Sequence, residues 1–388
     1  MFDRLYRHGR LFGIGLAAAL LSACGGGSAT SPEVEPFYLE EEEEWSLVWS
    51  DEFDGAAVDS ANWTFQLGDG SDNGLPGWGN YELQYYQADN ASIQDVDDTS
   101  ALVIEARQED VGNSAFTSAR MRSVNKFDFQ YGRVEIRSKA APGDGMWSAI
   151  WMMPTNSTYG TWAAGGEIDV MEVVNAGTDN QGVFMAAHYG FEWPLNQITT
   201  DAADVDDASD WHTHALEWSG DYLRWFVDGE HLKTVSKDAY YSYYFKDSTD
   251  GYQLATDPAA PFDRDFHLLV NLAVGGVGPG VELDPAAVPG EMVVDYIRVY
   301  ECNYATGNGT GCNTYGDRSL ASPDAQSPEV VTTDIYTDSV GPLTWEFLTG
   351  DVTRDLQAMV GYDNDGAIGI TVSEVAVEGR GNVLDVMS

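Results

Sequence analysis

Short runs of β-branched and aromatic residues, separated by clusters of Gly, Asp, Asn and Pro, recur along the chain from Trp45 onward. No stretch in this region keeps a helical period for more than about two turns. Many short strands joined by turns are typical of a β-sandwich, so the sequence predicts an all-β domain over residues 45–302. The runs are WSLVWSDEF, ALVIEAR, GRVEIRSK, GEIDVMEVV, THALEWS, YLRWFVDG, FHLLVNLAVGG and VVDYIRVYE.

The N-terminus has the pattern of a bacterial export signal. Arg4, Arg7 and Arg10 precede the apolar run LFGIGLAAALL, which is too short to span a bilayer comfortably. The run ends in LSAC, and a small-residue site directly before a cysteine resembles the lipobox of bacterial lipoproteins. We therefore predict a signal peptide over 1–23 and a lipid on Cys24. The alternative is an ordinary secretory signal with an incidental cysteine.

Either signal exports the protein from the cytoplasm. The GGGS that follows Cys24 is typical of a flexible tether, and Gly25 in place of Asp resembles the sorting pattern of the outer membrane. We expect a lipid-anchored protein at the bacterial cell envelope, in the outer membrane, or a secreted protein if the signal is ordinary. Residues 24–44 end in the acidic run LEEEEE and are predicted to form an acidic linker.

The chain is strongly acidic, with 63 Asp and Glu against 19 Lys and Arg, and a formal net charge of -44. A surface this negative repels nucleic acid and anionic lipid, so we do not expect a nucleic-acid partner. It also disfavours an anionic polymer as substrate. A neutral or cationic partner fits the charge better.

Beyond the predicted sandwich the chain changes character. Cys302 and Cys312 are close in sequence, and in an oxidising compartment they are predicted to form a local disulfide. Residues 303–328 are polar and contain Gly, Ser and Pro, which predicts a linker. Residues 329–388 have β-like runs but are too short for a full sandwich, so we interpret them as a β-rich and incomplete accessory module.

The segment GEIDVMEVV carries three acids in an unusual phase. Glu167 and Asp169 point to one face of a strand, whereas Glu172, three residues further, falls on the other face. A β-bulge between Asp169 and Glu172 would bring all three to the same face. The two glutamates would then reach the separation of about 5–5.5 Å that a retaining glycosidase needs. The alternative is an edge strand with a solvated acidic face.

Several tryptophans lie near this segment: Trp147 and Trp151 in GMWSAIWMMP, and Trp162 shortly before Glu167. Aromatic faces stack on sugar rings, so a groove lined by tryptophan around paired acids favours a saccharide site. For each tryptophan, packing in the core is the alternative.

With these segments the chain resembles glycoside hydrolase family 16, and within it the laminarinase-like subgroup. The residues EIDVME, 167–172, match the bulged ExDxxE signature of that subgroup. The resemblance extends over residues 45–301 and does not reach the C-terminal region. Further matching segments, in order, are WGNYELQYY, YGRVEIRSK, GMWSAIWMMP, PFDRDFHLLVNLAVGG and MVVDYIRVYE.

The resemblance implies a concanavalin-like jelly-roll sandwich with an open concave cleft that cuts internal β-glucosidic bonds with retention. Glu167 takes the place of the nucleophile, Glu172 that of the acid/base and Asp169 that of a helper, with no cofactor for catalysis. Asp295, with Glu52 and Gly132 nearby, matches a structural calcium site of the family. The positions that match substrate-binding residues are Asn80, Glu82, Arg120, Trp147, Trp151, Trp162 and His188, although His188 has the alternative of a structural interior histidine.

The function that follows is an endo-β-1,3-glucanase acting on laminarin-like β-glucan. The alternatives are a mixed β-1,3-1,4-glucanase, another family 16 hydrolase or transglycosylase, and a non-catalytic glucan-binding protein. The last of these is disfavoured because both glutamates are present. Two segments depart from the family pattern, HYGFEWP and the tyrosine-rich YYSYYF at 240–245, and we expect them to reshape the product side of the cleft.

Overall fold

The computed structural model describes residues 44–246, 251–312 and 314, and the backbone of four strands nearer the C-terminus. The predicted signal peptide, Cys24 and nearly all of the acidic linker lie outside the described residues. No helix within the described part of the chain is both long and apolar enough to cross a membrane.

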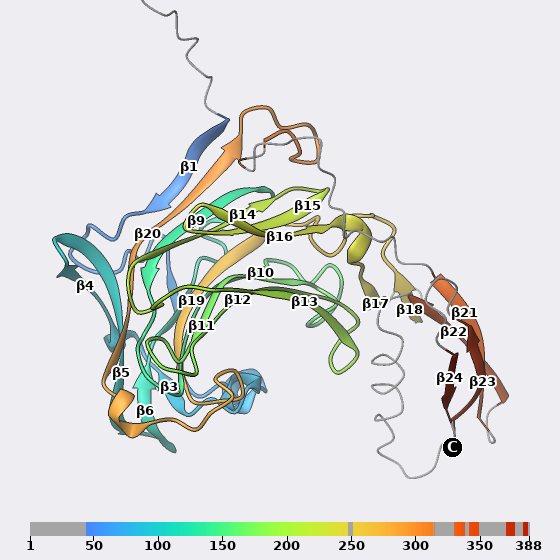
Figure 1. Cartoon of the computed structure of the whole chain (residues 1–388), viewed down its shortest axis with the longest axis horizontal. Helices are drawn as coiled ribbons and strands as arrows, with labels where there is room; N and C mark the ends of the chain where they lie inside the picture. Colours follow the sequence, from blue (N-terminus) through green and yellow to red (C-terminus); the bar gives the residue numbers. More distant parts are fainter. Residues whose placement is uncertain are drawn as a thin grey trace, which may run out of the picture. The chain divides into compact units, whose positions relative to one another are not determined.

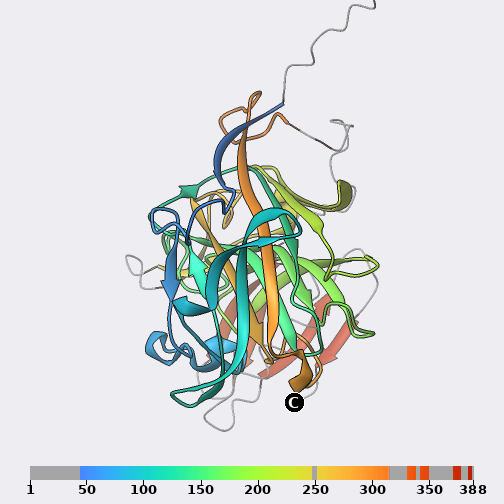
Figure 2. The ribbon, with the colours of Figure 1, turned by 90° about the vertical axis from the view of Figure 1, so that its left-hand side faces the viewer.

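Two sheets pack face to face (Figure 1). In the ten-stranded sheet, the pairs are antiparallel except for β3 and β6. Figure 2 shows β20, in orange, running between β5 and β9 across this sheet. Its path is β16 (Glu230–Ser236), β15 (Tyr222–Val227), β14 (His212–Trp218), β9 (Gly132–Lys139), β20 (Gly290–Cys302), β5 (Thr99–Val111), β6 (Ser114–Ser118) and β3 (Gln84–Tyr86), while β1 (Trp45–Asp51) pairs with β20 and β4 (Ala91–Val96) with β5.

The second sheet has eight strands, and neighbouring strands in it run antiparallel. Its centre is formed by β11, β10 and β19. Its path is β13 (Asn196–Ala203), β12 (Gly182–Gly190), β11 (Glu167–Val174), β10 (Met146–Pro154), β19 (Phe266–Val274), β7 (Arg120–Arg122) and β2 (Thr64–Gln66), with β8 (Asp128–Phe129) also paired to β19.

The main hydrophobic core lies between these two sheets. In β9 the alternation is strict, since Val134 and Ile136 are buried while the charged residues between them are partly exposed. This period of two is what a strand with one covered face requires. Strand β19 is buried at every position, because it lies in the middle of its sheet. The largest fully buried side chains are Trp218 and Trp225, both from the ten-stranded sheet.

The remaining elements are short. A separate two-stranded sheet pairs β17 (Tyr243–Lys246) with β18 (Gly251–Leu254). In the C-terminal region, β21 (Val330–Thr337), β22 (Gly341–Leu348), β23 (Ile370–Ala376) and β24 (Val383–Val386) form a four-stranded antiparallel sheet. The described residues contain no α-helix, which confirms the predicted all-β fold with a β-rich C-terminal segment. The 3-10 turns are η1 (Ser71–Asn73), η2 (Pro76–Gly79), η3 (Ala88–Asn90), η4 (Lys237–Ala239) and η5 (Pro285–Ala287).

Candidate active site

Strand β11 carries the three acids, and its pairing with β12 skips one residue. Asp169 lies opposite Ala186, but Glu172 lies opposite Phe184, so three steps along β11 match two along β12. The extra residue is a β-bulge, and it confirms the bulge predicted between Asp169 and Glu172. The register between β11 and β10 shifts at the same place.

The bulge turns two successive residues, Val170 and Met171, into the hydrophobic core. In a regular strand one of them would face outward. Because both face inward, Glu172 shares the outer face of the sheet with Glu167 and Asp169. The two glutamates are partly exposed, whereas Asp169 between them is buried.

Each glutamate accepts a hydrogen bond from one tryptophan. The indole N–H of Trp162 donates to Oε2 of Glu167 at 3.0 Å, and that of Trp147 donates to Oε1 of Glu172 at 3.1 Å. An N–H donor stabilises the ionised form of a carboxyl group, so each tryptophan lowers the pKa of the glutamate that it contacts. The tryptophans are therefore more than packing residues.

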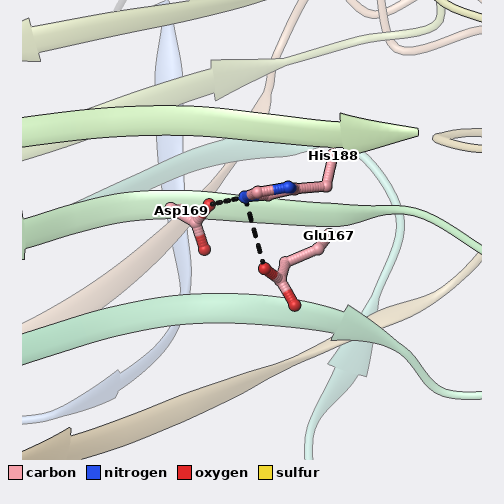
Figure 3. Close-up of side chains that lie close together, drawn as sticks. All are labelled: Glu167, Asp169 and His188. Atoms are coloured by element: carbon pink, nitrogen blue, oxygen red, sulfur yellow. Dashed lines mark ion pairs between the residues drawn. The ribbon is translucent and has the colours of Figure 1, made fainter. Parts of the chain in front are cut away.

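His188, on β12, faces the first two acids (Figure 3). Its Nε2 lies 3.3 Å from Oδ2 of Asp169 and 3.6 Å from Oε1 of Glu167. The imidazole therefore lies within reach of Glu167 and Asp169 and can exchange a hydrogen bond with them.

Burial raises the pKa of all three acids. The pKa of Glu167 rises to about 8, mainly through desolvation and then through the charge of Asp169, and the pKa of Glu172 rises to about 8 for the same two reasons. Desolvation alone raises the pKa of Asp169 to about 8. With all three pKa values near 8, the cluster retains at least one proton at neutral pH.

Asp169 is also held through its main chain. Trp225, on β15 in the opposite sheet, reaches across the core and donates its indole N–H to the carbonyl oxygen of Asp169 at 2.9 Å. This oxygen lies at the bulge, where the regular ladder is interrupted. Trp225 therefore satisfies a buried acceptor next to the acids.

Arg120 lies between two indole rings. Its guanidinium carbon is 4.5 Å from the ring centre of Trp78 and 4.9 Å from that of Trp151. Its Nε donates to Gln66 at 2.8 Å, and the N–H of Trp151 donates to Asn271 at 2.8 Å. The two predicted sugar-binding residues, Arg120 and Trp151, thus form one stacked unit.

Glu82 is the centre of a buried hydrogen-bond network. Its Oε1 accepts from Asn80 at 3.2 Å, and its Oε2 accepts from Gln84 at 2.6 Å and from the hydroxyl of Tyr86 at 3.0 Å. The Tyr86 hydroxyl accepts from Asn271, the partner of Trp151. With a side chain only 8% exposed, Glu82 orients its neighbours and offers little surface to a ligand.

Sequence reasoning missed several members of this arrangement. Gln84 and Tyr86 follow Glu82 at a period of two, which places all three on one face of an extended segment and was a usable signal. Asn271 is, besides His267, a polar residue in the mostly apolar strand FHLLVNLAV, which also marked it. Nothing local in the sequence pointed to Gln66, Trp78 or Trp225 as parts of the site.

The acidic residues near Asp295 do not fit a calcium ion. Its Oδ1 accepts from the hydroxyl of Thr99 at 2.9 Å, and its Oδ2 forms an ion pair with Arg137. The carboxylate of Glu52 accepts two hydrogen bonds from Arg298, from Nε at 2.9 Å and from Nη2 at 2.7 Å. A cation at Asp295 would face a guanidinium group, so electrostatics do not favour a calcium ion bound through this side chain.

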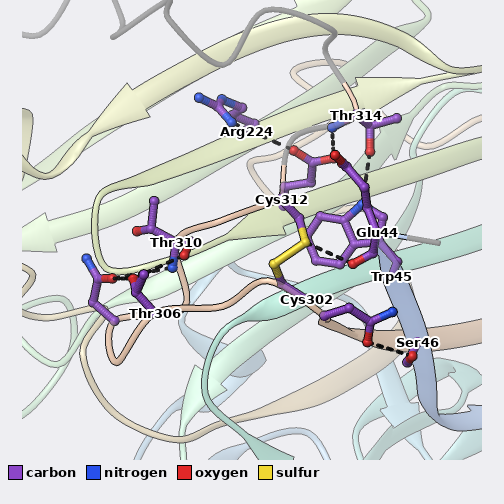
Figure 4. The surroundings of a disulfide bond; sticks show 12 residues. Glu44, Trp45, Ser46, Arg224, Cys302, Thr306, Thr310, Cys312 and Thr314 are labelled. Carbon is purple, nitrogen blue, oxygen red and sulfur yellow. Dashed lines mark hydrogen bonds and ion pairs between the residues drawn. A yellow bond between two sulfur atoms is a disulfide. The ribbon is translucent and has the colours of Figure 1, made fainter. Parts of the chain in front are cut away.

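Cys302 and Cys312 form a disulfide with a Cα–Cα distance of 5.6 Å (Figure 4). The hydroxyl of Tyr222 donates to the carbonyl of Cys312 at 2.8 Å, and Gly220 N–H donates to the carbonyl of Asn308 at 2.7 Å. The first residues of the predicted linker, 303–312, are therefore bound to the ten-stranded sheet. The sandwich extends beyond residue 302, and most of the rest of that linker lies outside the described residues.

A model of the glycosyl hydrolases family 16 matches residues 81–252, which include all three acids. A β-glucanase from Rhodothermus marinus is 39% identical over 270 residues, which cover 66% of this chain and 85% of that protein. A glucan endo-1,3-β-glucosidase A1 from Niallia circulans is 35% identical over 268 residues. That match covers 66% of this chain but only 38% of the longer relative.

Solved structures agree with the sequence relatives. The catalytic domain of an endo-1,3-β-glucanase (laminarinase) from Thermotoga petrophila RKU-1 is 37% identical, with a TM-score of 0.56. The match covers 68% of this chain and all of that domain. The sandwich, the bulged acidic strand and these relatives together lead to one conclusion: the chain belongs to the glycosyl hydrolases family 16.

Proposed function

We propose that the chain is an endo-acting, retaining glycoside hydrolase that cleaves β-1,3-glucosidic bonds in laminarin-like β-glucans. The observation that carries this proposal is the bulge that brings Glu172 to the face of Glu167, with one tryptophan donor on each carboxyl group. The named activities of the Niallia and Thermotoga relatives support the β-1,3 linkage.

In the first step, ionised Glu167 attacks the anomeric carbon. The bond from that carbon to the glycosidic oxygen breaks, and protonated Glu172 gives its proton to the leaving oxygen. In the second step, Glu172 takes a proton from water, the water oxygen bonds to the anomeric carbon, and Glu167 leaves as a carboxylate. Two inversions at one carbon release a β-anomer. Catalysis in this family needs no cofactor.

The raised pKa values suit this division of labour. A pKa of about 8 keeps Glu172 protonated at neutral pH, as a general acid must be. Asp169, whose pKa is also raised, keeps a proton close to Glu167 and can donate it in a hydrogen bond to the nucleophile. Burial and the charge of Asp169 raise the pKa of Glu167 to about 8 as well, while His188 and the Trp162 N–H act against this rise and favour the ionised nucleophile.

Substrate recognition would rest on the aromatic and amide groups around the acids. Trp147 and Trp162 lie beside the two glutamates, and the stacked unit of Arg120 and Trp151 presents a guanidinium group able to donate to sugar hydroxyls. The net charge of -44 favours a neutral glucan over a sulfated polymer.

The test compares wild type with Glu167→Gln and Glu172→Gln on laminarin, lichenan, agarose and carrageenan. We expect wild type to degrade laminarin to oligosaccharides, with the β-anomer seen first by NMR, and each variant to lose at least about 10³-fold in kcat. Early release of the α-anomer would contradict the two-step mechanism. Equal turnover of laminarin and lichenan would favour the mixed-linkage alternative.

We also propose that the protein is exported and anchored by a lipid on Cys24. Support comes from the arginines of the first ten residues, the LSAC site and the charge-free tether that follows. Palmitate labelling in a bacterial host should mark wild type and leave Cys24→Ser unlabelled. Equal labelling of the two proteins would exclude the lipobox.

A further inference from the structure

The tyrosine-rich segment that departs from the family pattern forms β17, and its residues divide between two faces. Tyr243 and Phe245 are two apart in this strand, and Tyr252 on β18 lies directly opposite Phe245. These three side chains therefore share one face of the two-stranded sheet. Tyr244, between them, points the other way and packs against Tyr159 in a small buried cluster.

The shared face is an aromatic surface that is open to solvent. The rings of Tyr243 and Tyr252 are nearly parallel, 2° apart with centres separated by 5.9 Å, and Phe191 packs 4.5 Å from Tyr243. Phe245 is 38% exposed and Tyr252 is 50% exposed. We define the aromatic surface as these four residues together with Trp193, which lies two residues beyond Phe191 and is 70% exposed.

Two of the exposed rings, Phe245 and Tyr252, are direct neighbours with centres 5.4 Å apart. Trp193 follows Glu192, whose carboxylate accepts a hydrogen bond from Tyr252. Leaving several large rings in water gains nothing for folding, because a buried aromatic ring stabilises more than an exposed one. An exposed aromatic cluster of this kind indicates a surface that binds a ligand.

A continuous set of contacts joins the aromatic surface to the catalytic acids. The Tyr252 hydroxyl donates to Oε2 of Glu192, and the N–H of Thr161 donates to Oε1 of the same carboxylate. The N–H of Trp193 donates to the carbonyl of Trp162 at 2.9 Å. The indole of Trp162 in turn donates to Glu167. Trp193 of the aromatic surface therefore contacts the same tryptophan that contacts the proposed nucleophile.

We propose that the aromatic surface is an extended binding platform for the β-glucan chain beyond the sugars held at the acids. This inference rests on the proposed function, because it assigns the platform to the same polysaccharide. The exposed rings of Phe245, Tyr252 and Trp193 can pack against the apolar sides of neutral sugar rings. A second copy of this chain is the less suitable occupant, because each copy carries a net charge of -44 and repels the other.

The platform can be tested by binding in the full-length Glu167→Gln protein, where turnover does not consume the ligand. Calorimetry would compare this protein with and without Trp193→Ala and Tyr252→Ala, using laminarin and a β-1,3-linked glucose trisaccharide. We expect the two alanines together to weaken laminarin binding about tenfold and to leave trisaccharide binding unchanged, because the short ligand does not extend beyond the acids. Tyr304→Ala, at a tyrosine that is 42% exposed in the 303–312 segment, is the matched control and should change neither affinity.

Unchanged laminarin affinity, or an equal loss for both ligands, would overturn the platform. The platform would also be overturned if the Glu167→Gln protein formed a concentration-dependent dimer and the two alanine substitutions abolished that dimer. The rings would then form an interface between two copies of the chain. Hydrolysis of laminarin by wild type tests the proposed function separately. If wild type degrades laminarin while the binding result is negative, the platform fails and the hydrolase stands.

Discussion

At the scale of single residues, the site places like charges where folding alone would avoid them. Glu167, Asp169 and Glu172 share one face of β11, and burial raises the pKa of each. No Lys or Arg forms an ion pair with any of them among the described residues, and His188 is the one basic partner within 4 Å. Such a cluster costs stability, which is expected where chemistry requires it.

The pH dependence of stability follows from the raised pKa of Glu172. Between its ordinary value of 4.5 and about 8, the folded protein holds a proton at Glu172 that the unfolded chain has released. The free energy of unfolding therefore falls as pH rises through this window. Glu172→Gln cannot ionise, so it removes this pH-dependent loss of stability. The melting temperature of the variant should match that of wild type near pH 4 and exceed it by roughly 2–4 °C at pH 9.

Thermal melts at both pH values check this expectation, with Glu291→Gln as the control at an exposed position of β20. The control should show no pH-dependent gain. A Glu172→Gln protein that is more stable at pH 4 than at pH 9, relative to wild type, would contradict the raised pKa.

At the scale of elements, the decisive feature is a single bulge in β11. It re-aims Glu172, and it leaves a buried carbonyl at Asp169 that Trp225 satisfies from the opposite sheet. The strand that carries the three acids is thereby fastened to β15 of the opposite sheet. The acids keep their mutual geometry because both sheets hold the bulge.

Trp225→Phe tests the role of that bond while keeping an aromatic ring in the core. We expect the free energy of unfolding to fall by about 1–3 kcal/mol, since a buried acceptor loses its donor. We also expect kcat on laminarin to fall by roughly tenfold or more with little change in KM, because the bulge positions the acid/base and not the sugar platform.

Trp218→Phe is the matched control for this experiment. Trp218 is equally buried, at 1% exposure, and its indole N–H donates to the carbonyl of Phe262 at 3.0 Å. It should lose similar stability and keep kcat. If the two variants lowered kcat equally, Trp225 would have no special role at the site.

At the scale of the whole molecule, the two sheets carry different tasks. The eight-stranded sheet holds the acids, whereas the outward face of the ten-stranded sheet gathers several of the few cations of this acidic chain into ion pairs. Arg133 pairs with Glu135 and Glu217, Arg137 with Asp295, and Arg298 with Glu52. The disulfide segment closes on the same sheet through Tyr222.

The ion pair at Asp295 predicts stability without a metal. Because Arg137 already neutralises this carboxylate, removal of calcium with EDTA should leave the melting temperature unchanged. A melting temperature that drops by several degrees in EDTA and recovers with calcium would show that a cation site exists despite Arg137.

For the disulfide we expect its removal to change the stability of the fold and not the rate of catalysis. Cys302→Ser with Cys312→Ser should lower the free energy of unfolding by about 2–3 kcal/mol, the loss expected for opening a short loop. Turnover of laminarin at 25 °C should stay within about twofold of wild type, because the segment contacts only the ten-stranded sheet among the described strands. A large fall in kcat would show that the two sheets are coupled.

The sequence by itself determined the all-β class and the family and located the three acids, because each shows in short segments whose pattern does not depend on tertiary contacts. The bulge could be inferred because the phase of Glu172 conflicts with a regular strand of period two. The pairing of the two cysteines followed from their closeness in the chain.

Only the tertiary structure decided which groups support those acids. Trp225 and Asp169 are 56 residues apart, Tyr86 and Asn271 are 185 apart, and Asp295 meets Arg137 across 158 residues. Periodicity reports which face of a strand is covered but not which distant strand covers it. The donors that hold the bulge, the Glu82 network and the ion pair between Asp295 and Arg137 therefore emerged only when the sheets were packed together.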